Sequence, residues 1–329
     1  MTETFNAFVV DEKDGNVTNE FKKLTFDDLP EGEVLIKVKY SGINYKDALA
    51  TRANTKIVQS YPMVPGIDIA GVVESSDTNT FDKGDEVVVT GYELGTNHYG
   101  GFSEYARVKE EWIVPLPKDL TLEEAMIYGT AGYTAGLAIE RLEHNGLSVE
   151  KDDVLVRGAT GGVGTLATMM LDSIGYDVIA STGKQGVEDR LKTLGAKEVI
   201  SRIKESDSKP LGKRQWQAVI DPIGGESLSQ IIKQLDYEGS VAVIGMTGGT
   251  QFETSVFPFI LRGANVIGID SVYTAMNRRK HIWGRLSRDL KPDKLHDIKQ
   301  IVEFKDIEQY INEVLEHNNS GRIVIKFED

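Results

Sequence analysis

Cysteine is absent from this chain of 329 residues. Without a thiol, the protein cannot form a disulfide, use a cysteine nucleophile or bind zinc through thiolates. The five histidines, His98, His144, His281, His296 and His317, show no H-x-x-x-H or comparable ligand spacing. We therefore predict a protein without a bound metal.

Long apolar runs and an excess of basic charge are also lacking. No apolar stretch approaches the roughly 18 residues that a membrane-spanning helix needs, and the opening segment MTETFNAFVVDEKDG does not resemble a signal peptide. The 37 basic residues against 51 acidic ones leave a net charge of −14, which repels nucleic acid and anionic membrane surfaces. We expect a cytoplasmic protein that binds neither.

The chain has the length and composition of a globular protein with two domains. Hydrophobic residues make up 40% and charged residues 27%, and single cores stop growing near ~250 to 300 residues. The first part reads as short strands between turns, at residues 5–10, 33–40, 67–76, 85–92 and 104–117. This spacing predicts a β-rich domain, a barrel.

From residue 121 onward, helical segments alternate with short apolar strands. A helix is predicted over 121–146, with Thr121 and Glu124 as a capping box. Strands follow at 153–159, 176–182, 197–201, 217–225, 239–246 and 265–270, the rhythm of a doubly wound parallel sheet. A polar helix near 276–288 and a last strand, GRIVIKF at 321–327, are expected to rejoin the first domain. The predicted domains are 1–125 with 266–329, catalytic, and 126–265, nucleotide-binding.

A glycine-rich turn joins the strand at 153–159 to a helix. Glycines there let backbone N–H groups approach a pyrophosphate at the helix N-terminus. The predicted contacts are Thr160, Gly161, Gly162, Val163 and Gly164. The spacing G-x-x-G-G-x-G departs from the usual G-x-G-x-x-G, so a plain structural turn is the alternative.

The end of the second Rossmann strand indicates which nucleotide binds. Ser181, Thr182, Gly183 and Lys184 stand where an NAD enzyme places an acidic residue on the ribose. Hydroxyls and a lysine suit an additional 2′-phosphate, so the sequence predicts NADPH. Arg202 is a second candidate for this phosphate, with an exposed surface arginine as the equal alternative.

Several motifs in order resemble the medium-chain dehydrogenase/reductase superfamily, in its zinc-free quinone oxidoreductase branch. They are SGINYKD (41–47), PMVPGIDIAG (62–71), GGFSEYARV (100–108), GTAGYTA (129–135), the glycine turn, LKTLGA (191–196) and GRIVIKF. The combination is similar to the bacterial subfamily that includes acrylyl-CoA reductase. The resemblance implies an α/β fold, with a GroES-like β-barrel catalytic domain and a Rossmann domain.

The resemblance also implies a site. Asn44 and the run Gly66-Ile67-Asp68 stand where zinc enzymes of the superfamily keep metal ligands. It places Asn44, Tyr45 and Asp68 around the nicotinamide, Asn44 and Tyr45 as donors or orienters, Asp68 as an orienting or proton-relay carboxylate. A turn-forming or packing role is the alternative for these three residues.

Further cofactor contacts are expected at Tyr45 and at Thr130, which resembles a family position near the nicotinamide. Met246, Ile260 and Ser271 are expected at the ends of the fifth and sixth Rossmann strands, where cofactors bind in such sheets.

The resulting hypothesis is hydride transfer from NADPH to the C=C bond of a short enoyl thioester, acrylyl-CoA to propionyl-CoA. NADPH:quinone oxidoreduction is the alternative, and a non-enzymatic NADPH sensor or structural protein is a remote one. The apolar run at 256–270 predicts a homodimer through edge-strand pairing. Four basic residues are candidates to bind a CoA phosphate: Arg52, Lys56, Arg278 and Arg279. The favoured interpretation is that they are solvated surface charges.

Overall fold

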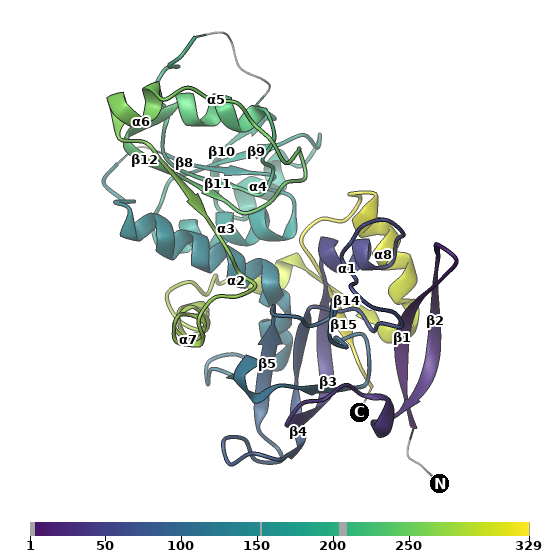
Figure 1. Cartoon of the computed structure of the whole chain (residues 1–329). Coiled ribbons are helices and arrows are strands. Elements are labelled where there is room, and N and C mark those ends of the chain that lie inside the picture. The colour runs from purple at the N-terminus through teal and green to yellow at the C-terminus, as the bar shows by residue number, and fades with distance from the viewer. Residues whose placement is uncertain (1–3, 152, 204–208, 329) are drawn as a thin grey trace. The chain divides into compact units, whose positions relative to one another are not determined.

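The computed structural model describes residues 4–151, 153–203 and 209–328 (Figure 1). The chain divides into two compact units. Unit 1 comprises Met1–Thr130, Val272–Trp283 and His296–Asp329, and unit 2 comprises Ala131–Ser271 and Gly284–Leu295. The predicted domain boundaries, at 125/126 and 265/266, lie a few residues from the unit boundaries at 130/131 and 271/272. Residues 284–295 group with unit 2, whereas the sequence analysis assigned them to the catalytic domain.

Unit 1 is built on a seven-stranded sheet in the order β14-β15-β3-β4-β5-β7, with β6 paired to β3. The strands are β3 (Val34–Ile43), β4 (Asp68–Ser76), β5 (Glu86–Thr90), β6 (Tyr105–Val108), β7 (Ile113–Pro115), β14 (Lys299–Glu303) and β15 (Arg322–Lys326). All pairs are antiparallel except β14 with β15. The predicted last strand is β15, and it pairs with β3 near the centre of the sheet.

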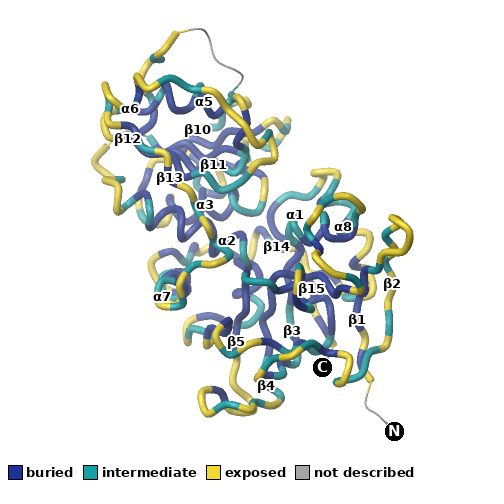
Figure 2. The backbone as a smooth tube through the Cα atoms, viewed as in Figure 1, coloured by how far each residue is buried: buried dark blue, intermediate teal, exposed yellow. Residues whose placement is uncertain are grey.

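A hairpin of β1 (Thr4–Lys13) and β2 (Asn16–Thr25) packs beside this sheet. Backbone bonds from Phe8 to Phe102 and between Val10 and Met63 tie β1 to the rest of unit 1. The sequence analysis missed β2, because its side chains are largely exposed and carry no apolar run (Figure 2).

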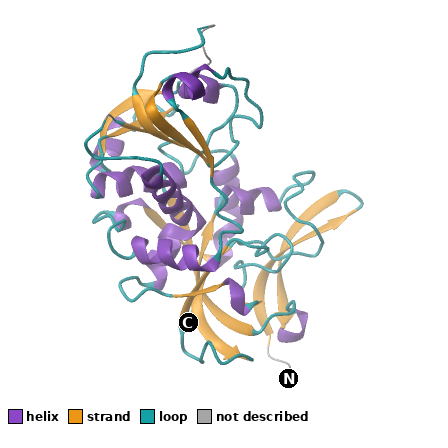
Figure 3. Ribbon diagram, turned by 60° about the vertical axis from the view of Figure 1, so that its left-hand side comes forward, coloured by secondary structure: helices purple, strands orange, loops and turns teal. Residues whose placement is uncertain are grey.

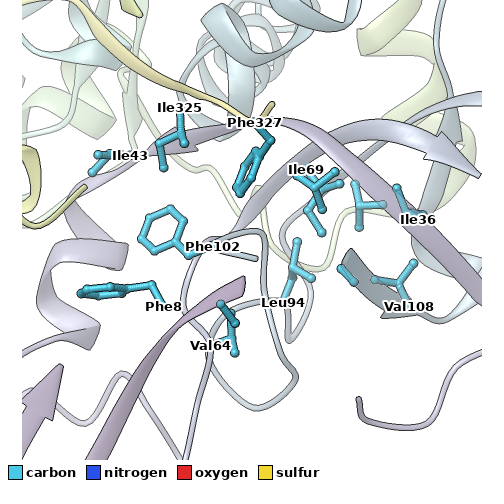
Figure 4. Packing of buried hydrophobic residues seen from close by; sticks show 14 of the residues in the cluster. Phe8, Ile36, Ile43, Val64, Ile69, Leu94, Phe102, Val108, Ile325 and Phe327 are labelled. Carbon is cyan, nitrogen blue, oxygen red and sulfur yellow. The ribbon is translucent and has the colours of Figure 1, made fainter. Parts of the chain in front are cut away.

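The core of unit 1 collects the apolar faces of these strands. Phe8, Ile36, Ile69, Phe102 and Ile325 interlock there although they come from distant parts of the chain (Figure 4). Burying side chains of this size contributes roughly 1.5–3 kcal/mol each. The first and last segments of the sequence are thereby held in one unit.

Three short α-helices belong wholly or mainly to unit 1. They are α1 (Tyr45–Ala50), α7 (Met276–Leu286) and α8 (Ile307–Leu315). The unit's 3-10 helices are η1 (Phe26–Asp28), η2 (Glu110–Trp112) and η4 (Phe304–Asp306), while η3 (Leu295–Ile298) begins at the last residue of unit 2. The predicted polar helix is confirmed as α7.

Unit 2 holds a six-stranded parallel sheet in the order β10-β9-β8-β11-β12-β13. The strands are β8 (Val154–Arg157), β9 (Val178–Thr182), β10 (Ala196–Ser201), β11 (Trp216–Asp221), β12 (Leu235–Val243) and β13 (Asn265–Gly268). The connecting helices are α3 (Gly162–Ser173), α4 (Glu188–Thr193), α5 (Ser227–Lys233) and α6 (Phe257–Arg262). Helices α5 and α6 lie on the opposite face of the sheet from α3 (Figures 1 and 3). The doubly wound Rossmann topology is confirmed.

The long helix α2 (Leu122–His144) begins in unit 1 with the predicted capping box. Thr121 N donates to Glu124 Oε2 at 3.0 Å, and Glu124 N donates to Thr121 Oγ1 at 3.1 Å. The helix is interrupted at Gly129, whose φ of 48° and ψ of −153° are not helical. A second helix segment therefore starts at Thr130.

Candidate active site

Asp68 is the centre of a buried polar cluster in unit 1. Its side chain is 0% exposed. It accepts hydrogen bonds from Asn44 Nδ2 at 2.7 Å, Thr130 N at 2.9 Å and Thr130 Oγ1 at 2.5 Å. The Asp68 carboxylate is thus fully buried and holds the Asn44 amide and the Thr130 side chain in place.

The break at Gly129 makes this arrangement possible. A Cβ on Gly129 would lie 2.3 Å from Asp68 Oδ2, and its φ of +48° is one that side chains disfavour. Because the helix restarts there, the Thr130 N–H lies at a helix start and donates to the Asp68 carboxylate. The motif GTAGYTA thus encodes a kink that presents a helix N-terminus to an acid.

Arg322 completes the cluster and was missed by the sequence analysis. Its side chain, on β15, is buried; Nε donates to the carbonyl of Ile127 at 2.9 Å and Nη1 to Asn44 Oδ1 at 3.1 Å. Nη2 lies 3.6 Å from Asp68 Oδ2. Burial lowers the pKa of the guanidinium, while the Asp68 and Asp47 carboxylates act in the opposite direction. An arginine stays charged under such conditions, so the ion pair is maintained.

A second buried carboxylate, Asp47, lies on the other side of Asn44. Asp47 Oδ2 accepts from the Asn44 backbone N–H at 2.8 Å and from Asn44 Nδ2 at 3.1 Å, and its Oδ1 accepts from Ile67 N at 2.8 Å. Burial, with the neighbouring Asp68 charge, raises the pKa of Asp47 to about 7. The sequence analysis quoted Asp47 only as part of a motif and gave it no role.

The Asn44 amide is consequently occupied on every side. Nδ2 donates to Asp47 and Asp68, and Oδ1 accepts from Arg322. The sequence analysis expected Asn44 to act as a donor to the ligand or as an orienting residue. Because its amide groups are engaged within the cluster, the orienting role fits this geometry better.

Tyr45 is the polar residue of the site that reaches the surface. It is the first residue of α1, 39% exposed, and its ring stacks on His317 with centroids 5.3 Å apart and an interplanar angle of 22°. Its hydroxyl has no hydrogen-bond partner among the described residues. The structure thus joins Asn44, Asp68 and Thr130 by hydrogen bonds, and Tyr45 follows Asn44 in the chain with its hydroxyl available as a donor.

The glycine turn of unit 2 has the geometry expected of a phosphate-binding turn. A Cβ on Gly164 would lie 2.3 Å from the carbonyl of Gly158, so only glycine lets α3 pack this closely on the end of β8. Gly161 is the N-cap of α3. The N–H groups of the next three residues, Gly162, Val163 and Gly164, have no partner within the helix, as at every helix start.

The end of β9 places polar and cationic groups next to this turn. Thr160 Oγ1 and Thr182 Oγ1 are 3.5 Å apart, and Lys184 N donates to Thr182 Oγ1 at 3.1 Å. A Cβ on Gly183 would lie 2.8 Å from Arg202 Nη2, so the Arg202 guanidinium covers this residue. Partial burial and Arg190 lower the pKa of Lys184, as expected for a lysine surrounded by other cations.

Two of the other predicted residues, Ser181 and Ile260, fit less well. Ser181 is buried, and its hydroxyl donates to the carbonyl of Ser201 at 3.3 Å within the sheet. Ile260 lies on α6, before β13 begins, so its predicted position at the end of the sixth strand is wrong; the chain runs from β12 through this helix first. Met246 and Ser271 do follow β12 and β13, and Met246 is exposed.

Two buried arginines outside the cluster also escaped the sequence analysis. Arg157, at the end of β8, pairs with Asp221 Oδ1 at 2.8 Å, and both side chains are buried. Arg279, expected to be a solvated charge, is 0% exposed and donates to the carbonyls of Thr90 and Val272. Neither position in sequence signals burial, because Asp221 and Thr90 are distant along the chain from the arginines that they bind.

The described residues contain no helix long and apolar enough to cross a membrane. In the same residues no group of three or more His, Cys, Asp or Glu side chains is arranged to hold a metal ion.

Comparison with known proteins defines the class. Residues 30–118 match the alcohol dehydrogenase GroES-like domain, and residues 162–284 match the zinc-binding dehydrogenase family. The Bacillus subtilis protein YhfP, provisionally named a quinone oxidoreductase, is 50% identical over 99% of this chain and 100% of its own length. Acrylyl-CoA reductase AcuI of Ruegeria pomeroyi is 42% identical over 98% of both chains.

Solved structures of similar proteins indicate the same class. B. subtilis YhfP with NAD bound has a TM-score of 0.97 at 49% identity, covering 99% of this chain and 100% of that one. Escherichia coli YhdH with bound NADPH has a TM-score of 0.94 at 38% identity, covering 97% and 99%. The chain belongs to the medium-chain dehydrogenase/reductase superfamily, in the group of oxidoreductases that contains YhfP and AcuI.

Proposed function

We propose that this protein is an NADPH-dependent reductase of short enoyl-CoA thioesters, with acrylyl-CoA as the substrate and propionyl-CoA as the product. The observation that carries the proposal is the pairing of an unengaged Tyr45 hydroxyl with a rigid, buried Asn44–Asp68–Arg322 cluster. The proposal is also supported by a relative: an acrylyl-CoA reductase is 42% identical to this protein over nearly the whole chain.

The residues of unit 2 fit the dinucleotide. The first-turn N–H groups of α3 would hold the pyrophosphate. Because Gly164 has no side chain, the start of α3 packs directly against the backbone of the glycine turn at Gly158. Thr160 and Thr182 add hydroxyls, and Lys184 with Arg202 would hold a 2′-phosphate. When bound, NADPH supplies the hydride for the β-carbon of the enoyl group.

The residues of unit 1 would serve the acceptor. As the thioester oxygen gains enolate character, the Tyr45 hydroxyl donates a hydrogen bond to it. Asn44 and Asp68 act on this group indirectly, because Asn44 is the N-cap of the helix that Tyr45 begins and Asp68 fixes the Asn44 amide. The proton for the α-carbon comes from Tyr45 or from water. We also retain Thr130 and Tyr45 as proposed contacts of the bound cofactor.

The preference for NADPH over NADH is part of the proposal. No carboxylate stands among residues 181–184, and two cations lie there. YhfP has been solved with NAD and YhdH with NADPH, so the two nucleotides must be compared directly. The test of selectivity is the ratio of kcat/KM values for the two cofactors.

Quinone reduction is the second candidate, favoured by the provisional name of the relative at 50% identity. A quinone needs a flat apolar slot and no phosphate contacts. The deciding assay follows the loss of NADPH absorbance with acrylyl-CoA, crotonyl-CoA and 1,4-benzoquinone. Turnover of acrylyl-CoA that falls at least tenfold in Tyr45→Phe supports the proposal; turnover of quinones alone contradicts it. Absence of all turnover favours the remote alternative, a sensor or structural protein.

Organisation and location complete the proposal. The predicted catalytic domain, 1–125 with 266–329, corresponds to unit 1 except for residues 284–295 and the few residues at each boundary, and the predicted NADPH-binding domain, 126–265, corresponds to unit 2; we propose a cytoplasmic protein with these two domains. A homodimer is supported by the edge strand β13, which pairs only with β12 among the described strands. Exposed apolar side chains surround it: Val256, Phe257, Ile260, Leu261 and Val266. Sedimentation equilibrium tests this, and a monomer at micromolar concentration would contradict it.

A further inference from the structure

His317 lies against the candidate site although no motif pointed to it. It follows the C-cap Glu316 of α8, and its imidazole stacks on Tyr45 with a centroid distance of 5.3 Å. Both side chains are exposed, and both belong to unit 1. A near-parallel ring pair at the surface restricts the rotamers that the tyrosine can occupy.

The backbone of His317 is held in a conformation that presents the ring. Its φ is +56°, in the left-handed region, at the helix C′ position where glycine or asparagine is usual. Histidine tolerates this region better than most residues but at some cost. A glycine at position 317 would relieve this backbone strain. The chain instead carries a histidine there, next to a polar site.

The helix that carries His317 is itself fixed to the helix that carries Tyr45. Arg52, just after α1, donates from Nη2 to Asn312 Oδ1 on α8. Residues Ile311 and Val314 of α8 are buried in the core of unit 1. The position of the imidazole is thus set by packing, whereas the Tyr45 hydroxyl has no bond of its own.

We propose that His317 is a positioning residue that aims the Tyr45 hydroxyl through ring stacking. The inference rests on the proposed function, in which that hydroxyl serves the acceptor. His317 does not touch the reacting atoms; it narrows the orientations of a side chain that does. Its loss should lower kcat by a larger factor than it raises the KM for NADPH, because the nucleotide contacts assigned to unit 2 are untouched.

The experiment uses the full chain with four variants. His317→Gly removes the ring and relieves the backbone, His317→Phe keeps a ring that can stack, Tyr45→Phe removes the hydroxyl, and the double variant combines His317→Gly with Tyr45→Phe. Asp14→Gly is the matched control: Asp14 has a φ of +52° in the β1–β2 turn, outside both α1 and α8. Its kinetic constants should equal those of the wild type.

We expect His317→Gly to lower kcat for acrylyl-CoA at least fivefold and His317→Phe to restore most of it. The double variant should be no slower than Tyr45→Phe alone, because His317 acts through the missing hydroxyl. Multiplicative losses in the double variant, or an unchanged kcat in His317→Gly, would overturn the proposal.

A second readout needs no substrate. The rate of Tyr45 nitration by tetranitromethane, followed by peptide mass spectrometry, should rise in His317→Gly and not in Asp14→Gly. If the wild type fails to reduce any acyl-CoA, the proposed function fails, while the nitration rates still decide the positioning of Tyr45. Equal nitration of Tyr45 in wild type and His317→Gly would overturn it.

Discussion

Replacing Asp47 by asparagine should change how stability depends on pH. Asp47 is a buried acid whose pKa lies at about 7, above its ordinary value of 3.8. An acid with a higher pKa in the folded state binds its proton more tightly there than in the unfolded chain. The associated stability is fully present below pH 3.8 and is lost as pH rises through about 7.

The size of the effect follows from this difference in pKa. At ~1.4 kcal/mol for each pKa unit, the rise from 3.8 to about 7 corresponds to up to about 4 kcal/mol. The neutral asparagine removes this dependence. It also removes one acceptor for the three N–H donors of Asn44 and Ile67, at a cost of roughly 1–3 kcal/mol that does not vary with pH.

The assay is urea unfolding of both proteins at a series of pH values from 5 to 9. All other titrating groups cancel in the difference between the two free energies of unfolding. We expect the variant to be the less stable protein at pH 5 and to gain on the wild type as the pH rises, most steeply below pH 7 and with little further change above it. A difference that stays constant over this range would refute the assigned burial and charge of Asp47.

Three further predictions follow from the site. Lys184→Glu should raise the KM for NADPH at least tenfold by losing a charged contact of ~1.5 to 3 kcal/mol; an unchanged KM would put the 2′-phosphate elsewhere. Gly129→Ala should destabilise the protein by at least ~2 kcal/mol, since its Cβ would meet Asp68 Oδ2 at a positive φ, and thermal unfolding measures this. Arg322→Met should cost ~3 to 5 kcal/mol, because Asp68 then remains buried without its countercharge; a stability equal to the wild type would show that the ion pair contributes nothing.

Local patterns in the sequence were sufficient for most of the fold. The capping box of Thr121 and Glu124 and the glycine turn at 158–164 depend on neighbours within a few residues. Strands β8, β9 and β11 are buried along their whole length, and they read as short apolar runs for that reason. By contrast β2 is exposed along much of its length, so it carried no such signal.

The candidate site divides in the same way. Asn44, Tyr45, Asp68 and Thr130 stand in recognisable motifs, and tertiary contacts bring them together. Arg322 is separated from Asn44 by 278 positions, and only the pairing of β15 with β3 makes them neighbours.

The sequence by itself determined the fold class, the position of the nucleotide turn and the residues that flank it, because each rests on periodicity, glycine or charge within a short segment. Only the tertiary structure decided which polar atoms are occupied. It buried Asp47 and Asp68, assigned both hydrogens of the Asn44 amide to them, and left the Tyr45 hydroxyl available. Burial and hydrogen-bond partners depend on contacts between segments far apart in the chain, and those contacts exist only after folding.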